Sequence, residues 1–426
     1  MTDLRVYWCA YDWAGHVSGP GTWLASLLPE LRRRGIDSVV NTLVWDSSGP
    51  LVESLRGNQI ETLVHPVAGT TQERIRTVIT GYEQSNADIF VANHVVPALF
   101  AAKWIQQIGV PALAVLHSDD AFYRGVIEVF LSGRSQDRVG NAVAVSQCLQ
   151  QLAVQTGAYS NCIHHLPYGV HVPSERPRRS NCSGVKLAFS GRMVQEQKRV
   201  LDVAHVMQRC VTEVEGCSGV LIGDGAEFAA VADLLQNQII AGQIELTGRL
   251  IPADVQDRLS TADILLLLSD YEGLPIALLE AMACGLVPVV SRMRSGIPEL
   301  VEHMVNGIVV EDRLESVLKS VRMLNSDAEL LQRLSMAARA TVLERFSHQR
   351  CADGWEALLR QLHSARRTRE QRVTVPRRFD LPPIHPALAA EDPRGRDLTI
   401  AESVLGTGRR FLKRFAGNSL EMTDNG

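Results

Sequence analysis

Short apolar runs alternate with helical stretches along most of this 426-residue chain, and this alternation constrains the fold more than any other feature. Several runs are continuously apolar, which is typical of parallel strands covered on both faces. Strands that alternate with helices predict a doubly wound α/β architecture. The strands that we expect lie at residues 4–11, 37–45, 87–94, 111–118, 141–146, 185–192, 219–225, 243–249, 262–269, 287–291 and 307–311.

A polar break separates two strand–helix series of similar size. It reads VPSERPRRSNCSG, ends at Gly184 and carries two prolines, which is typical of an interdomain linker. We therefore expect two Rossmann-like domains that face a central cleft, with ligands outside the carboxyl ends of the strands. The predicted regions are a first domain at 1–172, a linker at 173–184, a second domain at 185–350 and an Arg/Pro-rich, flexible tail at 365–426.

Composition excludes several classes of protein. A net charge of −4 and a pI near 6.3 predict no nucleic-acid partner. The N-terminal residues lack the basic and apolar regions of a signal peptide, and no apolar run approaches the roughly 20 residues of a spanning helix. The eight cysteines form no CxxC pair and no metal-ligand spacing, so we expect reduced thiols, no metal site and a cytoplasmic location.

The segment SDYEGLPIALLEAMACG carries two acids in positions that suit a ligand. Glu272 follows a buried strand, and the N–H groups of Gly273 and Leu274 lie near a helix start, where they can receive a diphosphate. Glu280 lies about 7–8 Å further along an otherwise apolar helix, where a carboxylate can accept bonds from the hydroxyls of a ribose. The alternative is a solvated Glu272 and a Glu280 paired with a buried Arg or Lys.

Cations and glycines follow other strands of the second series. Arg192 and Lys198 leave one strand end and suit a pyrophosphate, unless they belong to a solvated basic loop. Gly223 in LIGDG permits close approach of the backbone or only a tight turn. Arg249 in LTGRL lies at a further strand end.

In the first series, the loop HVSGPG follows the first strand and precedes a helix that we expect to begin near Thr22. Gly19 and Gly21 make it a flexible turn that can meet a phosphate or an acceptor, although it matches neither GxGxxG nor a P-loop. His117 lies at another strand end, as does His94. A lone histidine in such a position is more often structural than functional.

Together these motifs resemble the family-4 retaining glycosyltransferases of the GT-B fold, over most of residues 1–362. EGLPIALLE is similar to the family's E-x7-E signature, and GRMVQEQKR is similar to its phosphate-binding stretch. LIGDG, LTGR and GIPELVEHMVNGIVV follow in the family's order, as does AVSQCLQQLAVQTGA with HLPYGVHV before the linker. Tyr168 stands where the family usually has Asn, and we do not expect this difference to affect catalysis.

The resemblance implies a UDP- or GDP-sugar donor in the second domain, an acceptor in the first, retention of anomeric configuration, and no cofactor or obligatory metal. It assigns Glu272 and His117 to the donor sugar and Glu280 to the ribose. Arg192 and Lys198 are assigned to the diphosphate. Gly223 and Arg249 are also assigned to donor binding. On the acceptor side, the GPG sequence at Gly19 to Gly21 departs from the family's Gly-Gly pattern. A helix at 351–364 crosses back to the first domain.

Three rival functions remain open at this point. A nucleotide-sugar epimerase shares this architecture but needs no acceptor. A non-catalytic nucleotide-sugar sensor retains the pocket without turnover. A Rossmann oxidoreductase is disfavoured, because GxGxxG with its following acid is missing.

The tail carries a basic amphipathic patch, GTGRRFLKRFAG. Phe411 and Phe415 share one face of a helix there, beside four cations. Such a patch can lie on an anionic membrane, which predicts peripheral contact at the inner membrane face. The alternative is a solvated or disordered end, and the sequence does not indicate an oligomeric state.

Overall fold

The computed structural model describes residues 4–15, 17–174, 184–366 and 372–393. The chain divides into two compact units, and each is described by itself. Unit 1 comprises residues 1–168 and 351–412, and unit 2 comprises residues 169–350 and 413–426. The basic patch around Phe411 lies outside the described residues. None of the helices within the described ranges combines the length and the apolar character needed to cross a bilayer.

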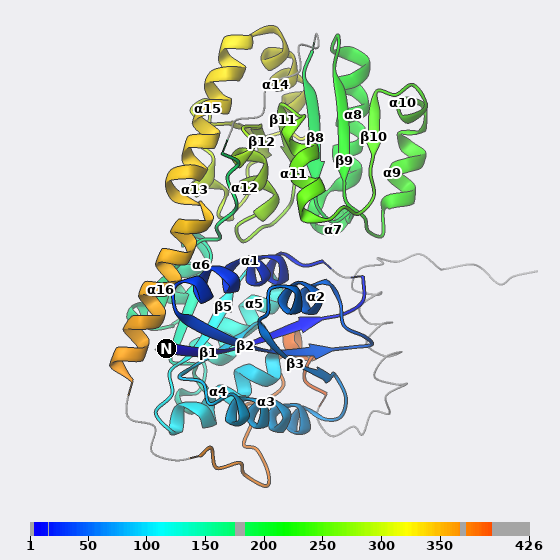
Figure 1. Ribbon diagram of the computed structural model, residues 1–426. Coiled ribbons are helices and arrows are strands. Elements are labelled where there is room, and N and C mark those ends of the chain that lie inside the picture. The colour runs from blue at the N-terminus through cyan, green and yellow to red at the C-terminus, as the bar shows by residue number, and fades with distance from the viewer. Residues whose placement is uncertain (1–3, 16, 175–183, 367–371, 394–426) are drawn as a thin grey trace, which may run out of the picture. The chain divides into compact units, whose positions relative to one another are not determined.

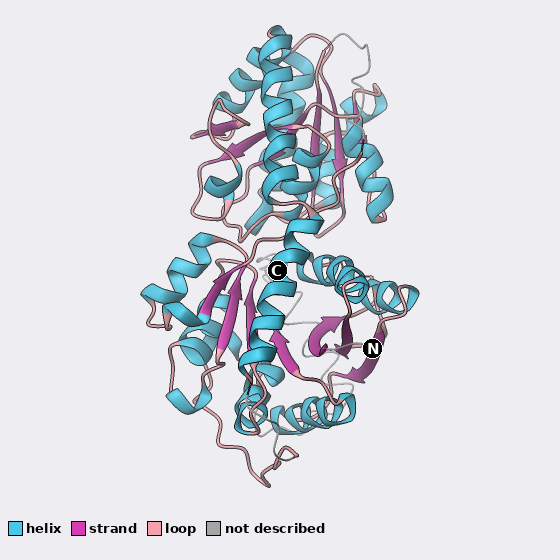
Figure 2. Ribbon diagram, turned by 60° about the vertical axis from the view of Figure 1, so that its left-hand side comes forward, coloured by secondary structure: helices cyan, strands magenta, loops and turns pink. Residues whose placement is uncertain are grey.

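Unit 1 contains a parallel seven-stranded sheet in the order β3-β2-β1-β4-β5-β6-β7, with helices on both faces (Figures 1 and 2). Its strands are β1 (Leu4–Asp12), β2 (Ile36–Val44), β3 (Glu61–Pro66), β4 (Ile89–Asn93), β5 (Ala112–Leu116), β6 (Asn141–Ala144) and β7 (Ile163–His165). Its helices before unit 2 are α1 (Gly19–Arg33), α2 (Pro50–Gly57), α3 (Thr71–Ser85), α4 (Val96–Gln107), α5 (Ala121–Val126) and α6 (Gln147–Gln155), with short turns η1 (Ile127–Leu131), η2 (Ser135–Asp137) and η3 (Ser160–Cys162).

Unit 2 contains a parallel six-stranded sheet in the order β10-β9-β8-β11-β12-β13. Its strands are β8 (Lys186–Ser190), β9 (Ser218–Ile222), β10 (Ile244–Leu246), β11 (Ile264–Leu267), β12 (Val287–Ser291) and β13 (Ile308–Val310). Its helices are α7 (Gln195–Lys198), α8 (Val200–Glu213), α9 (Phe228–Leu234), α10 (Gln236–Ile240), α11 (Pro252–Ser260), α12 (Ile276–Ala283), α13 (Ile297–Leu300), α14 (Glu315–Ser326) and α15 (Ala328–Arg345).

The predicted architecture is confirmed, because both units are parallel α/β sheets. All six strands expected in the second series are present, together with five in the first. The sequence missed β3 and β7, which are the two edge strands of unit 1. An edge strand is covered less fully than a central one, and β3 accordingly lacks a continuous buried run, while β7 has only three residues.

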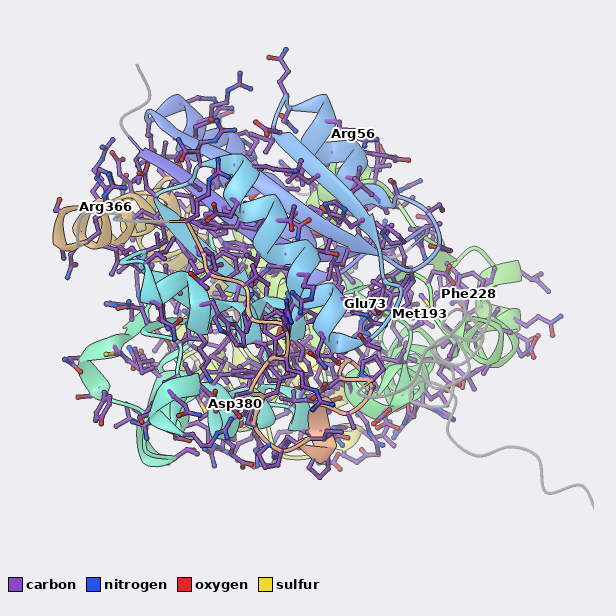
Figure 3. All side chains as sticks on the ribbon, turned by 90° about the horizontal axis from the view of Figure 1, so that it is seen from below. Arg56, Glu73, Met193, Phe228, Arg366 and Asp380 are labelled. Atoms are coloured by element: carbon purple, nitrogen blue, oxygen red, sulfur yellow. The ribbon has the colours of Figure 1, made fainter. Side chains whose placement is uncertain are left out.

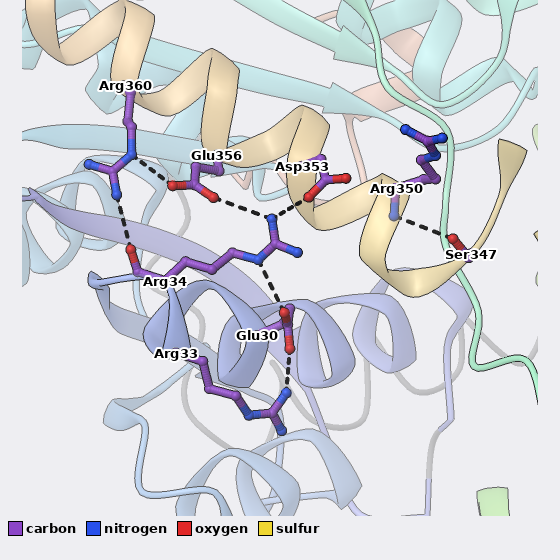
Figure 4. A network of polar contacts seen from close by, with 8 residues as sticks. All are labelled: Glu30, Arg33, Arg34, Ser347, Arg350, Asp353, Glu356 and Arg360. Carbon is purple, nitrogen blue, oxygen red and sulfur yellow. Dashed lines mark hydrogen bonds and ion pairs between the residues drawn. The ribbon is translucent and has the colours of Figure 1, made fainter. Parts of the chain in front are cut away.

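Helix α16 (His348–Ala365) belongs to unit 1 from Cys351 onward. Its Trp355 is buried, with its ring centroid 5.3 Å from that of Trp8 in β1 and 5.4 Å from that of Trp23 in α1. At the surface, Arg34 just after α1 donates to two carboxylates of α16, those of Asp353 and Glu356 (Figure 4). Aromatic packing and ion pairs therefore hold α16 to α1 over several turns.

One described part of the tail, residues 372–393, differs from its prediction. Residues 372–393 are not a free extension, because they pack along α3 and α4 of unit 1, with Phe379 and Leu388 buried. Figure 3 shows this segment crossing unit 1, with Asp380 labelled. Prolines remove helical and strand periodicity, so the sequence pattern could not reveal that a few apolar side chains anchor the segment.

Candidate active site

Glu272 lies in the loop between β11 and α12 of unit 2, and it is paired. Its carboxylate lies 2.6 Å from the ammonium of Lys198 at the end of α7, and both side chains are nearly buried. The structure thus brings together an acid and a cation that the sequence assigned to different parts of the donor. It excludes the alternative of a solvated loop acid for Glu272, whose exposure is 5%.

Glu280 lies on α12 and is partly buried between apolar neighbours. Among the described residues, none forms a hydrogen bond or an ion pair with its carboxylate, so the alternative of a structural ion pair is wrong. Burial raises the pKa of Glu280 to about 7. A carboxylate without a partner at this depth costs stability, and a ligand that donates hydrogen bonds would recover that cost.

The turn before α12 presents backbone donors. Pro275 is the N-cap residue of this helix, and its side chain makes no capping hydrogen bond. Within the described part of the chain, the N–H groups of Gly273 and Leu274 donate to no acceptor. The Gly273 carbonyl accepts from the N–H of Gly296 at 2.7 Å, which holds the turn against the loop before α13. Free N–H groups at a helix start are suited to an anion.

The loops after β8 and β9 interlock through glycines. Gly223 has φ +135, and a side chain there would meet the Gly191 carbonyl at 1.9 Å, so no other residue fits. Arg192 follows Gly191 and donates to the Gln197 side chain at 2.7 Å. The close approach of the two loops therefore positions Arg192 in the same strand-end region as Lys198.

Arg249 is placed differently from the other donor candidates. It is about half exposed and lies 3.7 Å from Asp224, which follows Gly223. Its assignment to the donor stays a prediction.

His117, at the end of β5 in unit 1, is buried and held at both ring nitrogens. Nε2 lies 2.6 Å from Oδ1 of Asn93, and Nδ1 lies 2.5 Å from the hydroxyl of Tyr168. Asn93 Oδ1 can only accept, so Nε2 carries the proton and Nδ1 accepts from the Tyr168 O–H. Burial, with a smaller contribution from His94, lowers the pKa of His117 well below its usual value. The imidazole is therefore neutral.

Tyr168 and Asn93 are the residues that sequence reasoning missed. The Tyr168 ring stacks on His117 at 5.8 Å, so the position where Asn is expected from the resemblance contacts a candidate catalytic residue directly. Asn93 has φ +52, a left-handed conformation that asparagine tolerates. The motif VANH contained both Asn93 and His94, but only the fold shows that the asparagine faces His117.

In unit 1, the helix that follows the first strand begins earlier than predicted. Gly19 and Gly21 lie in the first turn of α1, and the Ser18 hydroxyl caps the helix by accepting from the N–H of Gly21 at 3.1 Å. The prediction of a flexible turn up to Thr22 is therefore wrong, because Ser18 is a strong N-cap and Pro20 suits the first turn. A ligand role for these glycines stays a prediction.

Comparison with solved structures identifies the fold. The chain is similar to the Anabaena Alr3699/HepE crystal structure in complex with UDP-glucose, at 17% identity and a TM-score of 0.67, over 84% of this chain and 100% of that one. It is also similar to the crystal structure of TarM, at 12% identity and a TM-score of 0.66, over 84% and 99% of the two chains. Two parallel α/β units of this kind are the GT-B fold of glycosyltransferases.

Sequence comparison finds a family match within the second unit. Residues 176–341 match the family model for glycosyl transferases group 1. The N-acetyl-alpha-D-glucosaminyl L-malate synthase of Bacillus anthracis is 34% identical over 163 residues, 38% of this chain and 42% of that protein. The amylovoran biosynthesis glycosyltransferase AmsK of Erwinia amylovora is 34% identical over 160 residues, 35% and 39% of the two. The chain thus matches less than half the length of these curated relatives.

Proposed function

We propose that this protein is a retaining glycosyltransferase of family 4 that moves a sugar from a UDP- or GDP-sugar to an acceptor hydroxyl, without an obligatory metal or cofactor. The observation that carries the proposal is Glu280. It is a carboxylate on an apolar helix, without a hydrogen-bond or ion-pair partner in the described residues, and its pKa is raised to about 7 by burial. Two adjacent ribose hydroxyls would donate the hydrogen bonds that the Glu280 carboxylate does not receive from the described residues.

The remaining groups suit the diphosphate and the sugar. The N–H groups of Gly273 and Leu274 and the cations of Arg192 and Lys198 would stabilise the negative charge that develops as the nucleoside diphosphate departs. Lys198 would then exchange its contact with Glu272 for a phosphate oxygen. This exchange would free the Glu272 carboxylate to accept from a sugar hydroxyl.

Retention would follow from attack by the acceptor hydroxyl on the face from which the diphosphate leaves, a route that needs no protein nucleophile. The anomeric carbon loses its bond to the phosphate oxygen and gains one to the acceptor oxygen. The acceptor proton passes to the departing phosphate. The curated relatives include an amylovoran biosynthesis enzyme, and polysaccharide biosynthesis is a role that we propose for this chain as well.

The experiment that tests the proposal is calorimetric titration of the Glu280→Gln variant with UDP and with GDP. Loss of a charged hydrogen-bond pair should weaken the preferred nucleotide about ten- to a hundred-fold. Glu329→Gln is the matched control, because Glu329 is an exposed carboxylate in the first turn of α15. Equal affinity of wild type and folded Glu280→Gln would remove Glu280 from the donor site.

Product analysis separates the rival functions. A transferase consumes donor in proportion to acceptor, and NMR of the product gives its anomeric configuration. Epimerised nucleotide sugar formed without acceptor would establish the epimerase instead. Tight donor binding with no turnover across an acceptor panel would establish a sensor.

A further inference from the structure

The short helix that carries Lys198 also carries a glutamine, Gln197, in a position to bridge two loops of unit 2. Helix α7 follows β8, and the loop that carries Glu272 follows β11, which is the neighbouring strand in the sheet (Figure 1). Gln197 precedes Lys198 at the end of α7 and is half-buried. Because parallel neighbours end at the same edge of a sheet, the loops after β8 and β11 meet where Gln197 lies.

The Gln197 amide uses both of its polar atoms. Its Oε1 accepts from the guanidinium of Arg192 at 2.7 Å, and its Nε2 donates to the Tyr271 carbonyl at 3.3 Å. Tyr271 immediately precedes Glu272. The amide therefore links one predicted diphosphate cation to the loop of the predicted sugar-binding acid.

The chemistry of these two contacts favours an amide. A guanidinium can only donate and a carbonyl can only accept, so the group between them must do both. A carboxylate has no donor and an ammonium has no acceptor, whereas an amide has one of each. A glutamate at position 197 would keep the contact with Arg192 but would place an oxygen against the Tyr271 carbonyl.

The backbone of Gln197 makes a separate link to the same loop. Its carbonyl accepts from the N–H of Asp270 at 2.9 Å, and the Asp270 carboxylate is paired with Arg313, which follows β13. Lys198, the next residue of α7, pairs with Glu272 at 2.6 Å. Two consecutive residues of α7 thus contact the acid loop, and a third segment holds that loop from another side.

The side chain and the backbone of Gln197 therefore have different tasks. The backbone bond and the Lys198–Glu272 pair hold α7 to the acid loop without help from the amide. The amide acts on Arg192, whose long side chain has many rotamers and is restricted by this contact. Removal of the amide should release Arg192 and leave Lys198 in place.

We propose that Gln197 is a positioning residue of the diphosphate site, and that its amide ties Arg192 to the loop that carries Glu272. It thereby holds the guanidinium at a fixed place relative to the ammonium of Lys198. The diphosphate as the ligand rests on the proposed function. A cation that is already ordered loses less conformational freedom when it binds a phosphate, so this contact raises affinity.

Calorimetry with UDP and uridine tests this role. Gln197→Leu removes both amide contacts, so UDP should bind about fivefold more weakly, while uridine affinity should change by less than about twofold. Gln197→Glu has nearly the same shape, but its carboxylate neutralises Arg192 and repels the diphosphate, so UDP should bind about twentyfold more weakly. If the amide only supported the fold, the order would be reversed, because the glutamate keeps one of the two contacts. That reversed order, or wild-type affinity in both variants, would overturn the proposal.

A double-mutant cycle shows whether Gln197 acts through Arg192. Arg192→Ala removes the guanidinium, and the further change Gln197→Leu should then weaken UDP binding by less than about twofold. An undiminished loss in the Arg192→Ala background would overturn the proposal, since Gln197 would then act on the ligand by another route.

Gln195→Leu is the matched control. Gln195 is a half-buried glutamine of the same short helix, but its side chain contacts Leu201 and Asp202 in the first turn of α8. This variant should bind UDP as wild type does. A loss as large as that of Gln197→Leu would also overturn the proposal, because any change in α7 would then disturb the site.

Inorganic pyrophosphate, titrated into the same samples, separates this inference from the proposed function. If wild type binds UDP or GDP and neither Gln197 variant weakens it, only the role of Gln197 is refuted. If wild type binds pyrophosphate but neither nucleotide, and the Gln197 variants weaken that binding in the expected order, the role of Gln197 stands and the nucleotide-sugar function is refuted. If wild type binds none of these ligands, both are refuted.

Discussion

Both sheets place their candidate site residues at the carboxyl ends of parallel strands, but these residues differ in their chemistry. In unit 2 the edge is ionic: Lys198 and Glu272 pair at 2.6 Å, while Glu280 has no such partner among the described residues. In unit 1 the candidate catalytic residue is uncharged, because His117 is held between two hydrogen-bond partners among aromatic rings. Parallel strands deliver side chains to the same edge in both units, so the loop residues decide which ligand each edge suits.

The protonation states of the buried groups also differ between the two units. Burial lowers the pKa of His117 well below its usual value and that of His94 to about 4, so these rings stay neutral at pH 7. In unit 2 burial acts on a carboxylate and raises the pKa of Glu280 to about 7. Desolvation disfavours the charged form in each case, but only the carboxylate is brought into the physiological range.

Removal of Lys198 should have the largest effect. In Lys198→Ala the diphosphate loses a nearly buried cation, so UDP affinity should fall a hundred-fold or more while uridine affinity changes little. Calorimetry with both ligands measures the two changes. Lys186→Ala is the control, because Lys186 is a partly buried lysine at the start of β8 whose ammonium donates to the Thr261 hydroxyl. Equal losses for UDP and uridine would show that Lys198 does not contact the diphosphate.

Replacement of His117 should affect turnover rather than donor binding. We expect His117→Ala to lower kcat roughly ten- to a hundred-fold, because an interaction with the donor sugar would strengthen in the transition state. Donor affinity should stay within about threefold of wild type. His117→Gln, which preserves polar contacts to Asn93 and Tyr168, guards against a loss caused by unfolding. If both variants turn over at the wild-type rate, His117 is structural.

Acidification should weaken donor binding through Glu280. Ribose hydroxyls donate to the ionised carboxylate, so binding favours the deprotonated form, and protonation below pH 7 competes with it. With a pKa of about 7, UDP-glucose affinity should be about tenfold lower at pH 6 than at pH 8. UDP-glucose has no group that titrates in this range. The same pH dependence in Glu280→Gln would assign the effect to another residue.

The smallest effect should be on stability without nucleotide. The folded-state pKa of Glu280 is raised above its unfolded value, so its contribution to stability is complete below pH 4.5 and is lost as pH rises through 7. Glu280→Gln should therefore be more stable than wild type at pH 8 by about 1 kcal/mol, and not at pH 4. Urea midpoints at the two pH values measure this. A less stable variant at pH 8 would indicate a structural partner.

Much of the unit-2 site could be predicted from the sequence. Glu280 stood out because an acid in an apolar helix is unusual, and Glu272 because it follows the apolar run of β11. The pairing of Glu272 with Lys198 could not be predicted, because these residues are 74 positions apart and meet only when β8 and β11 become neighbours. Gly223 was ambiguous for the same reason, since its neighbour Gly191 lies on another loop.

The unit-1 site was less predictable. Tyr168 and Asn93 flank His117 from segments 51 and 24 residues away, and nothing in their local pattern distinguishes them from core residues. The C-terminal segment had no helical or strand period, so its contacts with α3, α4 and α5 were invisible. Its anchors are single apolar residues, separated by polar ones.

By itself, the sequence determined the parallel α/β architecture, the division into two series, and the acids and cations at the strand ends of unit 2. Periodic burial produces a periodic pattern of apolar residues along the chain, and a buried charge is recognised by the apolar residues that flank it. Only the tertiary structure decided that Lys198 neutralises Glu272, that His117 is held by Tyr168 and Asn93, and that Asp392 reaches the start of α3. These are contacts between distant segments, and sheet order and packing, rather than local spacing, bring their atoms together.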